Sequence, residues 1–169
     1  MERRGAGEIS EAGSLEYVIE KDISPDTIEQ VHAIAMDYTR DFFSENYPDD
    51  MRIDMLFQRA VLLKDGPEII SCIIFTGMDG SAHITMMATR RDCAGMGHGK
   101  LLMRRFAEHV TQLGLNSIEL FTYSPQSKPA YAATVGFYKS VGFKVIKECK
   151  DLWEPGTTTL KMRYEVKTA

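Results

Sequence analysis

Three glycines, Gly95, Gly97 and Gly99, stand at every second position of the segment CAGMGHGKLL, residues 93–102. Glycines keep Cβ atoms away from a ligand. A helix that begins beside them offers free N–H groups and a partial positive charge to an anion. A strand-to-helix turn by itself normally needs one glycine. The segment therefore indicates a phosphate-binding turn, with a purely structural turn as the alternative.

Two common nucleotide-binding loops do not fit this segment. The Walker A loop has a glycine, four further residues and then Gly-Lys-Ser/Thr, but Ala94 occupies the first glycine position and Leu101 the hydroxyl position. The dinucleotide fingerprint GxGxxG also fails, because the three glycines read GxGxG and come late in the chain. A nucleotide-binding protein is therefore disfavoured.

His83 is the candidate for proton transfer. It lies in the run SAHITMMAT, residues 81–89, which predicts a strand with His83, Thr85, Met87 and Thr89 on one face. An imidazole with the ordinary pKa of about 6.5 accepts a proton at neutral pH. The alternative is a histidine that simply packs on the face of a sheet.

The elements that must position these residues follow from the hydrophobic periodicity. Their order, β-α-α-β-β-β-α-β-α-β-β, indicates one α/β domain with a mixed sheet and helices packed on its faces. Residues 1–14 are rich in Gly, Glu and Ser and are expected to be disordered. The pattern predicts strands at 16–21, 60–64, 68–76, 81–89 and 117–123, helices at 24–43, 50–59, 102–113 and 128–142, and a final hairpin of 144–153 and 157–166.

Length and composition restrict the class of protein. A chain of 169 residues and 19.1 kDa is long enough for one buried core and short for two domains. The net charge of −4 argues against a nucleic-acid-binding protein with a broad basic face, and no apolar run is long enough for a membrane span. The three cysteines show no CxxC spacing, so neither a metal site nor a disulfide framework is expected. We expect a reducing compartment, cytoplasmic or nuclear.

Two segments resemble motifs of the GNAT N-acetyltransferase superfamily. GMGHGKLL is similar to its motif A, (Gln/Arg)-x-x-Gly-x-(Gly/Ala), of which Gly97-His98-Gly99 matches the last three positions and Ala94 departs from the first. GFYKSVGF, residues 136–143, is similar to motif B, which follows motif A in the same order. The stretch around the glycines also resembles the histone-acetyltransferase branch. The resemblance implies a single GNAT domain over residues 15–169, with a mixed, mostly antiparallel twisted sheet and about four helices.

The resemblance also implies a cosubstrate and its binding residues. Enzymes of this family transfer an acetyl group from acetyl-CoA to an amine, and no metal is required. The pantetheine arm of acetyl-CoA would contact the backbone of Met87, Ala88 and Thr89. The residues that would hold the pyrophosphate are Ala94, Gly95, Met96, Gly97, His98, Gly99 and Lys100.

Two side chains match the catalytic positions of the family. Tyr138 stands where the family usually has the general acid that protonates the departing thiolate, and His83 stands where the histone-acetyltransferase branch has its catalytic glutamate. Tyr138 has an alternative role as a packed aromatic side chain. Phe137, which cannot donate a proton, would take its place if the register shifted by one residue.

The acceptor is expected to be a primary amine: a protein lysine, a protein N-terminus or a small cationic amine. Acidic residues gather between the first two helices, where they could attract a cation, although a solvated acidic surface is the alternative reading. The family resemblance also allows a homodimer through the last two strands. Ala94 and the unusual His83 leave open a non-catalytic acyl-CoA-binding sensor or interaction module. The acidic residues are Asp41, Glu45, Asp49, Asp50 and Asp54.

Overall fold

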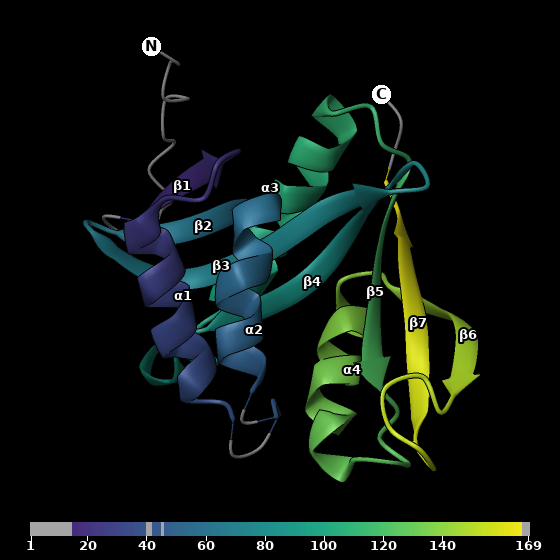
Figure 1. Ribbon diagram of the computed structural model, residues 1–169. Coiled ribbons are helices and arrows are strands. Elements are labelled where there is room, and N and C mark those ends of the chain that lie inside the picture. Colours follow the sequence, from purple (N-terminus) through teal and green to yellow (C-terminus); the bar gives the residue numbers. More distant parts are fainter. Residues whose placement is uncertain (1–14, 40–41, 45, 167–169) are drawn as a thin grey trace. The chain divides into compact units, whose positions relative to one another are not determined.

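The computed structural model describes residues 15–39, 42–44 and 46–166 (Figure 1). The tail at residues 1–14, expected to be disordered, lies outside the described residues. The predicted order of strands and helices is confirmed. The strands are β1 (Leu15–Glu20), β2 (Arg59–Asp65), β3 (Glu68–Met78), β4 (Ser81–Thr89), β5 (Ser117–Tyr123), β6 (Lys144–Lys150) and β7 (Thr158–Glu165), and the helices are α1 (Pro25–Met36), α2 (Tyr47–Asp54), α3 (His98–Gln112) and α4 (Ala132–Ser140).

The strands form one sheet in the order β1-β2-β3-β4-β5-β7-β6. Strands β4 and β5 pair in parallel, whereas the pairs β1–β2, β2–β3, β5–β7 and β6–β7 are antiparallel. The mixed, mostly antiparallel sheet of the predicted fold class is therefore confirmed. The chain divides into two compact units: the first contains the described residues up to Phe75 and Met86–Phe106, and the second contains Thr76–Thr85 and the residues from Ala107 onward.

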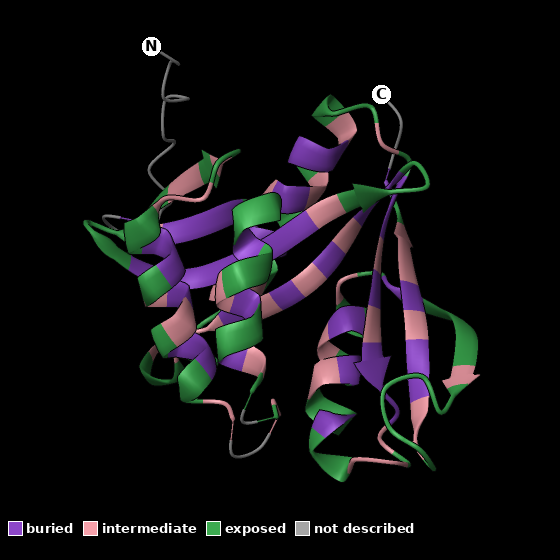
Figure 2. Ribbon diagram, viewed as in Figure 1, coloured by how far each residue is buried: buried purple, intermediate pink, exposed green. Residues whose placement is uncertain are grey.

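The first unit has a core between helices α1 and α2 and one face of its strands. Val31 and Ala35 of α1 are fully buried, and they belong to the same apolar cluster as Met55, Leu62 and Ile74. In Figure 2, helix α1 carries both buried and exposed residues, as expected for an amphipathic helix, whereas β2 and β3 are buried over most of their length. Burial of each large apolar side chain contributes about 1.5–3 kcal/mol.

Helix α1 begins as predicted but ends earlier than predicted. The Ser24 side chain accepts a hydrogen bond from the Thr27 N–H at 3.2 Å, and Pro25 occupies the first turn. The helix ends at Met36, so the expected continuation to residue 43 is wrong. Tertiary contacts explain the difference, because the Asp37 carbonyl accepts a hydrogen bond from Arg91 and the Tyr38 hydroxyl donates to the Thr89 carbonyl.

The second unit contains β5, β7, β6, the first half of β4, and α4, which lies alongside β5 in Figure 1. The hydroxyl groups of Ser81 on β4 and Ser117 on β5 are buried and lie 2.6 Å apart, which fixes the parallel register where the two strands begin. Gly142 ends α4 with φ of +110°, and an added Cβ there would lie 2.9 Å from the Tyr164 ring. A glycine is therefore required at this position for two reasons.

Candidate active site

The glycine segment forms a turn that leads directly into α3. Gly95 and Gly97 have φ of +77° and +84°, a conformation that other residues rarely adopt. The first helical bond runs from the Leu101 N–H to the Gly97 carbonyl at 3.1 Å. The N–H groups of the preceding helical residues thus have no partner within the helix and point out of its N-terminus. An anion such as a phosphate fits this end of α3.

Side chains of this turn leave room for a ligand. An added Cβ at Gly95 or Gly97 would meet no atom within 4 Å, so the positive φ, and not crowding within the chain, requires glycine there. Ala94 and Lys100 are exposed, and the Met96 side chain is 69% exposed. His98 is half-buried and begins the helix. The turn therefore presents mainly backbone groups, together with the exposed cationic side chain of Lys100.

The predicted pantetheine-binding residues lie at the end of β4, where other side chains hold the backbone in place. The Thr89 carbonyl accepts a hydrogen bond from the Tyr38 hydroxyl at 2.5 Å. The Ser71 hydroxyl lies 3.3 Å from the Ala88 carbonyl and 2.8 Å from the Thr89 hydroxyl. Met87 is half-buried on the face that it shares with Thr89. These contacts fix the strand just before the glycine turn.

Sequence reasoning missed the positioning roles of Tyr38 and Arg91. The Arg91 guanidinium lies 4.7 Å from the centre of the Tyr38 ring and donates to the Asp37 carbonyl at 2.6 Å. Arg90 pairs with Glu68 at 2.8 Å and with Asp92 at 2.6 Å. The two arginines that precede the glycine turn are therefore engaged in contacts that shape β4 and the end of α1. In the sequence, the adjacent Arg90 and Arg91 before the turn were the signal that could have pointed to these contacts.

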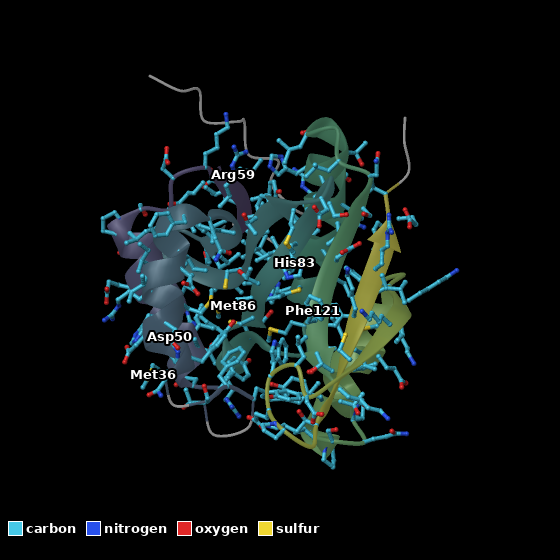
Figure 3. All side chains as sticks on the ribbon, turned by 45° about the vertical axis from the view of Figure 1, so that its right-hand side comes forward. Met36, Asp50, Arg59, His83, Met86 and Phe121 are labelled. Atoms are coloured by element: carbon cyan, nitrogen blue, oxygen red, sulfur yellow. The ribbon has the colours of Figure 1, made fainter. Side chains whose placement is uncertain are left out.

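His83 lies in the second unit, on β4 opposite Glu119 of β5 in the parallel register. The His83 and Phe121 rings lie 5.6 Å apart, and Figure 3 shows them on neighbouring strands. Nδ1 of His83 is buried and has no hydrogen-bond partner among the described residues. Burial lowers the pKa of His83; Glu119 partly opposes this effect and Lys161 reinforces it. The imidazole is therefore neutral at neutral pH and can accept a proton.

Tyr138 faces the interior of the second unit. It is buried, whereas the neighbouring Phe137 is half-buried, so the register of α4 directs the tyrosine inward. Its ring contacts those of Phe137 and Phe143, each with a centroid distance of 5.4 Å. Burial raises the pKa of the Tyr138 phenol, with a smaller contribution from Tyr131. The phenol stays protonated over the physiological pH range and can donate a proton.

The acidic residues expected to attract a cation lie partly on α2. Asp49, Asp50 and Asp54 are exposed, and Asp49 pairs with His32 at 2.9 Å. Asp41 and Glu45 lie outside the described residues. Apolar side chains accompany the acidic ones, which sequence reasoning missed: Ile53, Leu56 and Phe57 are 62%, 67% and 82% exposed. The surface at the end of α2 is thus both acidic and apolar.

Neither a metal centre nor a membrane helix stands out in the described part of the chain. Within it, no three His, Cys, Asp or Glu side chains are grouped as metal ligands would be. None of its helices is long and apolar enough to cross a membrane.

Several solved structures share this fold. A protein from Desulfovibrio desulfuricans, described as a GNAT-family acetyltransferase, superimposes with a TM-score of 0.76 and 16% identity, over 89% of this chain and 99% of that one. The ribosomal-protein-S18-alanine N-acetyltransferase of Escherichia coli superimposes with a TM-score of 0.70 and 13% identity, over 90% of this chain and 96% of that one. An aminoglycoside 6'-N-acetyltransferase in complex with coenzyme A superimposes with a TM-score of 0.70 and 14% identity, over 90% of this chain and 98% of that one.

Sequence comparison shows the family. No curated protein matches the chain in sequence. The profile of the acetyltransferase (GNAT) family, in contrast, matches residues 28–143, which include the glycine turn, His83 and Tyr138. This match covers more than half of the chain and confirms the resemblance in the two motifs. The chain belongs to the acetyltransferase (GNAT) family of N-acetyltransferases.

Proposed function

We propose that the protein transfers an acetyl group from acetyl-CoA to a primary amine by direct attack of the amine on the thioester. The observation that carries this proposal is the turn of Gly95 and Gly97 at the N-terminus of α3, in a chain of the GNAT family. A helix N-terminus with exposed N–H groups suits a pyrophosphate better than an uncharged ligand. The structural relative that was solved with coenzyme A supports the choice of cosubstrate.

Acetyl-CoA is proposed to bind through the backbone. Residues Ala94–Lys100 hold its pyrophosphate, and the backbone of Met87–Thr89 holds the pantetheine arm. The bonds from Tyr38 and Ser71 to the end of β4 support this role, because a strand that is already fixed loses little entropy when a ligand pairs with it. Ala94 replaces the usual Gln or Arg of the motif without removing a backbone N–H group.

His83 is proposed as the general base and Tyr138 as the general acid. The amine loses its proton to the His83 imidazole, and its lone pair attacks the carbonyl carbon of the thioester. The tetrahedral intermediate then collapses, the C–S bond breaks, and the thiolate of coenzyme A takes the proton of the Tyr138 phenol. The nitrogen, which became cationic on attack, loses its excess proton to the Tyr138 phenolate, so that the neutral amide forms and the phenol is restored. The lowered pKa of His83 keeps the proposed base neutral before the reaction, and the raised pKa of Tyr138 keeps the proposed acid protonated.

The acceptor is proposed to be a protein lysine, a protein N-terminus or a small cationic amine. The related structures include an enzyme named for an alanine of a ribosomal protein and another named for aminoglycosides. The exposed carboxylates Asp49, Asp50 and Asp54 would attract a cation, and the apolar side chains beside them would contact the rest of the acceptor.

Substitution of Tyr138 by phenylalanine tests this function. We expect Tyr138→Phe to reduce turnover about 100-fold or more, the usual contribution of a general acid, while the affinity for acetyl-CoA stays within a fewfold of wild type. Coenzyme A release with a panel of peptides and polyamines measures turnover, and calorimetry measures affinity. Binding of acetyl-CoA without turnover on any amine would instead favour the non-catalytic acyl-CoA sensor.

A further inference from the structure

A network of charged side chains lies on the sheet beside His83. Glu119 of β5 is the register partner of His83, and its side chain is only 14% exposed. Its carboxylate lies 3.2 Å from the Lys161 ammonium and 3.8 Å from the Arg163 guanidinium, both on β7. The largely buried Glu119 carboxylate thus lies beside two cations, of which Arg163 also pairs with Glu165 at 2.8 Å.

Strand geometry brings these side chains to one face. Glu119 pairs in register with Arg163, and Phe121 pairs with Lys161, so the four side chains lie on the same face of β5 and β7. The Lys161 ammonium lies 5.8 Å from the centre of the Phe121 ring, which also contacts the His83 ring. Lys161 and His83 therefore both lie against the ring of Phe121.

Few other charged groups act on the imidazole. Among the residues that the structure describes, Glu119 raises the pKa of His83 and Lys161 lowers it. Strand β4 carries no other titratable side chain from Ser81 to Thr89, and Asp79, in the turn between β3 and β4, is exposed. His83 therefore responds chiefly to its own burial and to this network.

We propose that Glu119 is a positioning residue for His83, and that Lys161 and Arg163 control how strongly its carboxylate attracts the proton that His83 accepts. This proposal rests on the proposed role of His83 as the base. With both cations in place, and Lys161 the closer of the two, the negative charge of the carboxylate is partly offset and the imidazole stays unprotonated before the reaction. When the acceptor transfers its proton, the new imidazolium gains a nearby carboxylate. Ion pairs next to a base tune its proton affinity in this way.

Two substitutions that should shift the pKa of His83 in opposite directions test the proposal. Glu119→Gln removes the carboxylate and should lower the pKa of His83 further below its ordinary value. Lys161→Met removes the cation and should raise the pKa. NMR titration of the histidine Cε1–H signals reads this out directly, and the signal of His83 is the one that disappears in His83→Gln. Lys150→Met on β6 is the matched control. Lys150 is exposed, and its substitution removes the same charge elsewhere on the sheet.

The same variants distinguish this proposal from the proposed function. We expect the acid-side midpoint of kcat/KM to move to lower pH in Glu119→Gln and to higher pH in Lys161→Met. An unchanged pKa of His83 in a folded Lys161→Met protein would overturn the network. A shifted pKa with an unshifted activity profile would confirm the network and overturn His83 as the base. Since Lys161 is 30% exposed, its variant should fold even if Glu119→Gln does not.

Discussion

The glycine turn and the surroundings of His83 use different parts of the chain. The turn offers backbone N–H groups, and its geometry depends on two positive φ angles and on a strand end held by Tyr38 and Ser71. Around His83 the chemistry lies in side chains, and protonation depends on burial and on Glu119 and Lys161. The difference predicts that the proposed backbone site tolerates Ala94, since it loses little when one side chain changes, whereas the proposed proton-transfer site would lose most of its activity.

Removal of the His83 side chain is expected to have the largest effect, and it distinguishes the two regions most clearly. His83→Ala should reduce kcat about 100-fold or more, because it removes the proposed base, and should leave the affinity for acetyl-CoA nearly unchanged. Steady-state kinetics and calorimetry measure the two quantities. His32→Ala, which removes a histidine distant in sequence from the proposed base, is the control and should keep kcat and the affinity for acetyl-CoA, although its pair with Asp49 is lost. Equal losses in both variants would contradict the role of His83.

The pH dependence of kcat/KM tests the protonation states proposed for His83 and Tyr138. A base works when it is neutral, so kcat/KM should be constant above the pKa of His83 and fall about tenfold per pH unit below it. Because burial lowers this pKa, the acid limb should lie below the ordinary value of about 6.5. Because burial raises the pKa of Tyr138, the alkaline limb should lie above about 10. An acid limb centred above pH 7 would be inconsistent with this assignment.

The next effect belongs to the glycine turn. Gly97→Ala forces an alanine into the left-handed backbone region, which costs about 1–2 kcal/mol. Either the ratio of folded to unfolded protein or the affinity for acetyl-CoA should therefore fall about 5- to 30-fold. Gly114→Ala is the matched control, because Gly114 has a similar φ of +78° beyond the other end of α3, so its variant should lose stability and keep the acetyl-CoA affinity. Calorimetry and urea unfolding together measure the loss. If both variants bind acetyl-CoA equally well, the backbone of the turn is not the binding element.

The smallest effect concerns the support of β4. Tyr38→Phe leaves the Thr89 carbonyl without its hydroxyl donor and should cost about 1 kcal/mol in the free energy of unfolding, with a small loss of acetyl-CoA affinity. Thr39→Ala removes an exposed, local hydrogen bond to the Met36 carbonyl and should change neither quantity measurably. A Tyr38→Phe protein as stable as wild type would show that the strand end does not depend on this bond.

Much of the architecture could be predicted from local sequence patterns. The element order follows from apolar periodicity, and the glycines that end α3 and α4, Gly114 and Gly142, have the positive φ expected of helix stops. The contacts of Tyr38 and Glu119 could not be predicted. Tyr38 continues the helical stripe of α1 in sequence, but its hydroxyl bonds to a strand 51 residues away. Glu119 faces His83 only because β4 and β5 pair in parallel.

Calorimetric titration with acetyl-CoA is the most direct test of the central claim, with ATP and NAD as comparison ligands. We expect micromolar binding of acetyl-CoA and none of the other two, since the turn lacks the Walker and dinucleotide patterns. The affinity should fall in Gly97→Ala and persist in His83→Ala and Tyr138→Phe. No heat and no thermal shift with acetyl-CoA would mean that the glycines form only a turn. The proposed acetyl transfer would then be wrong.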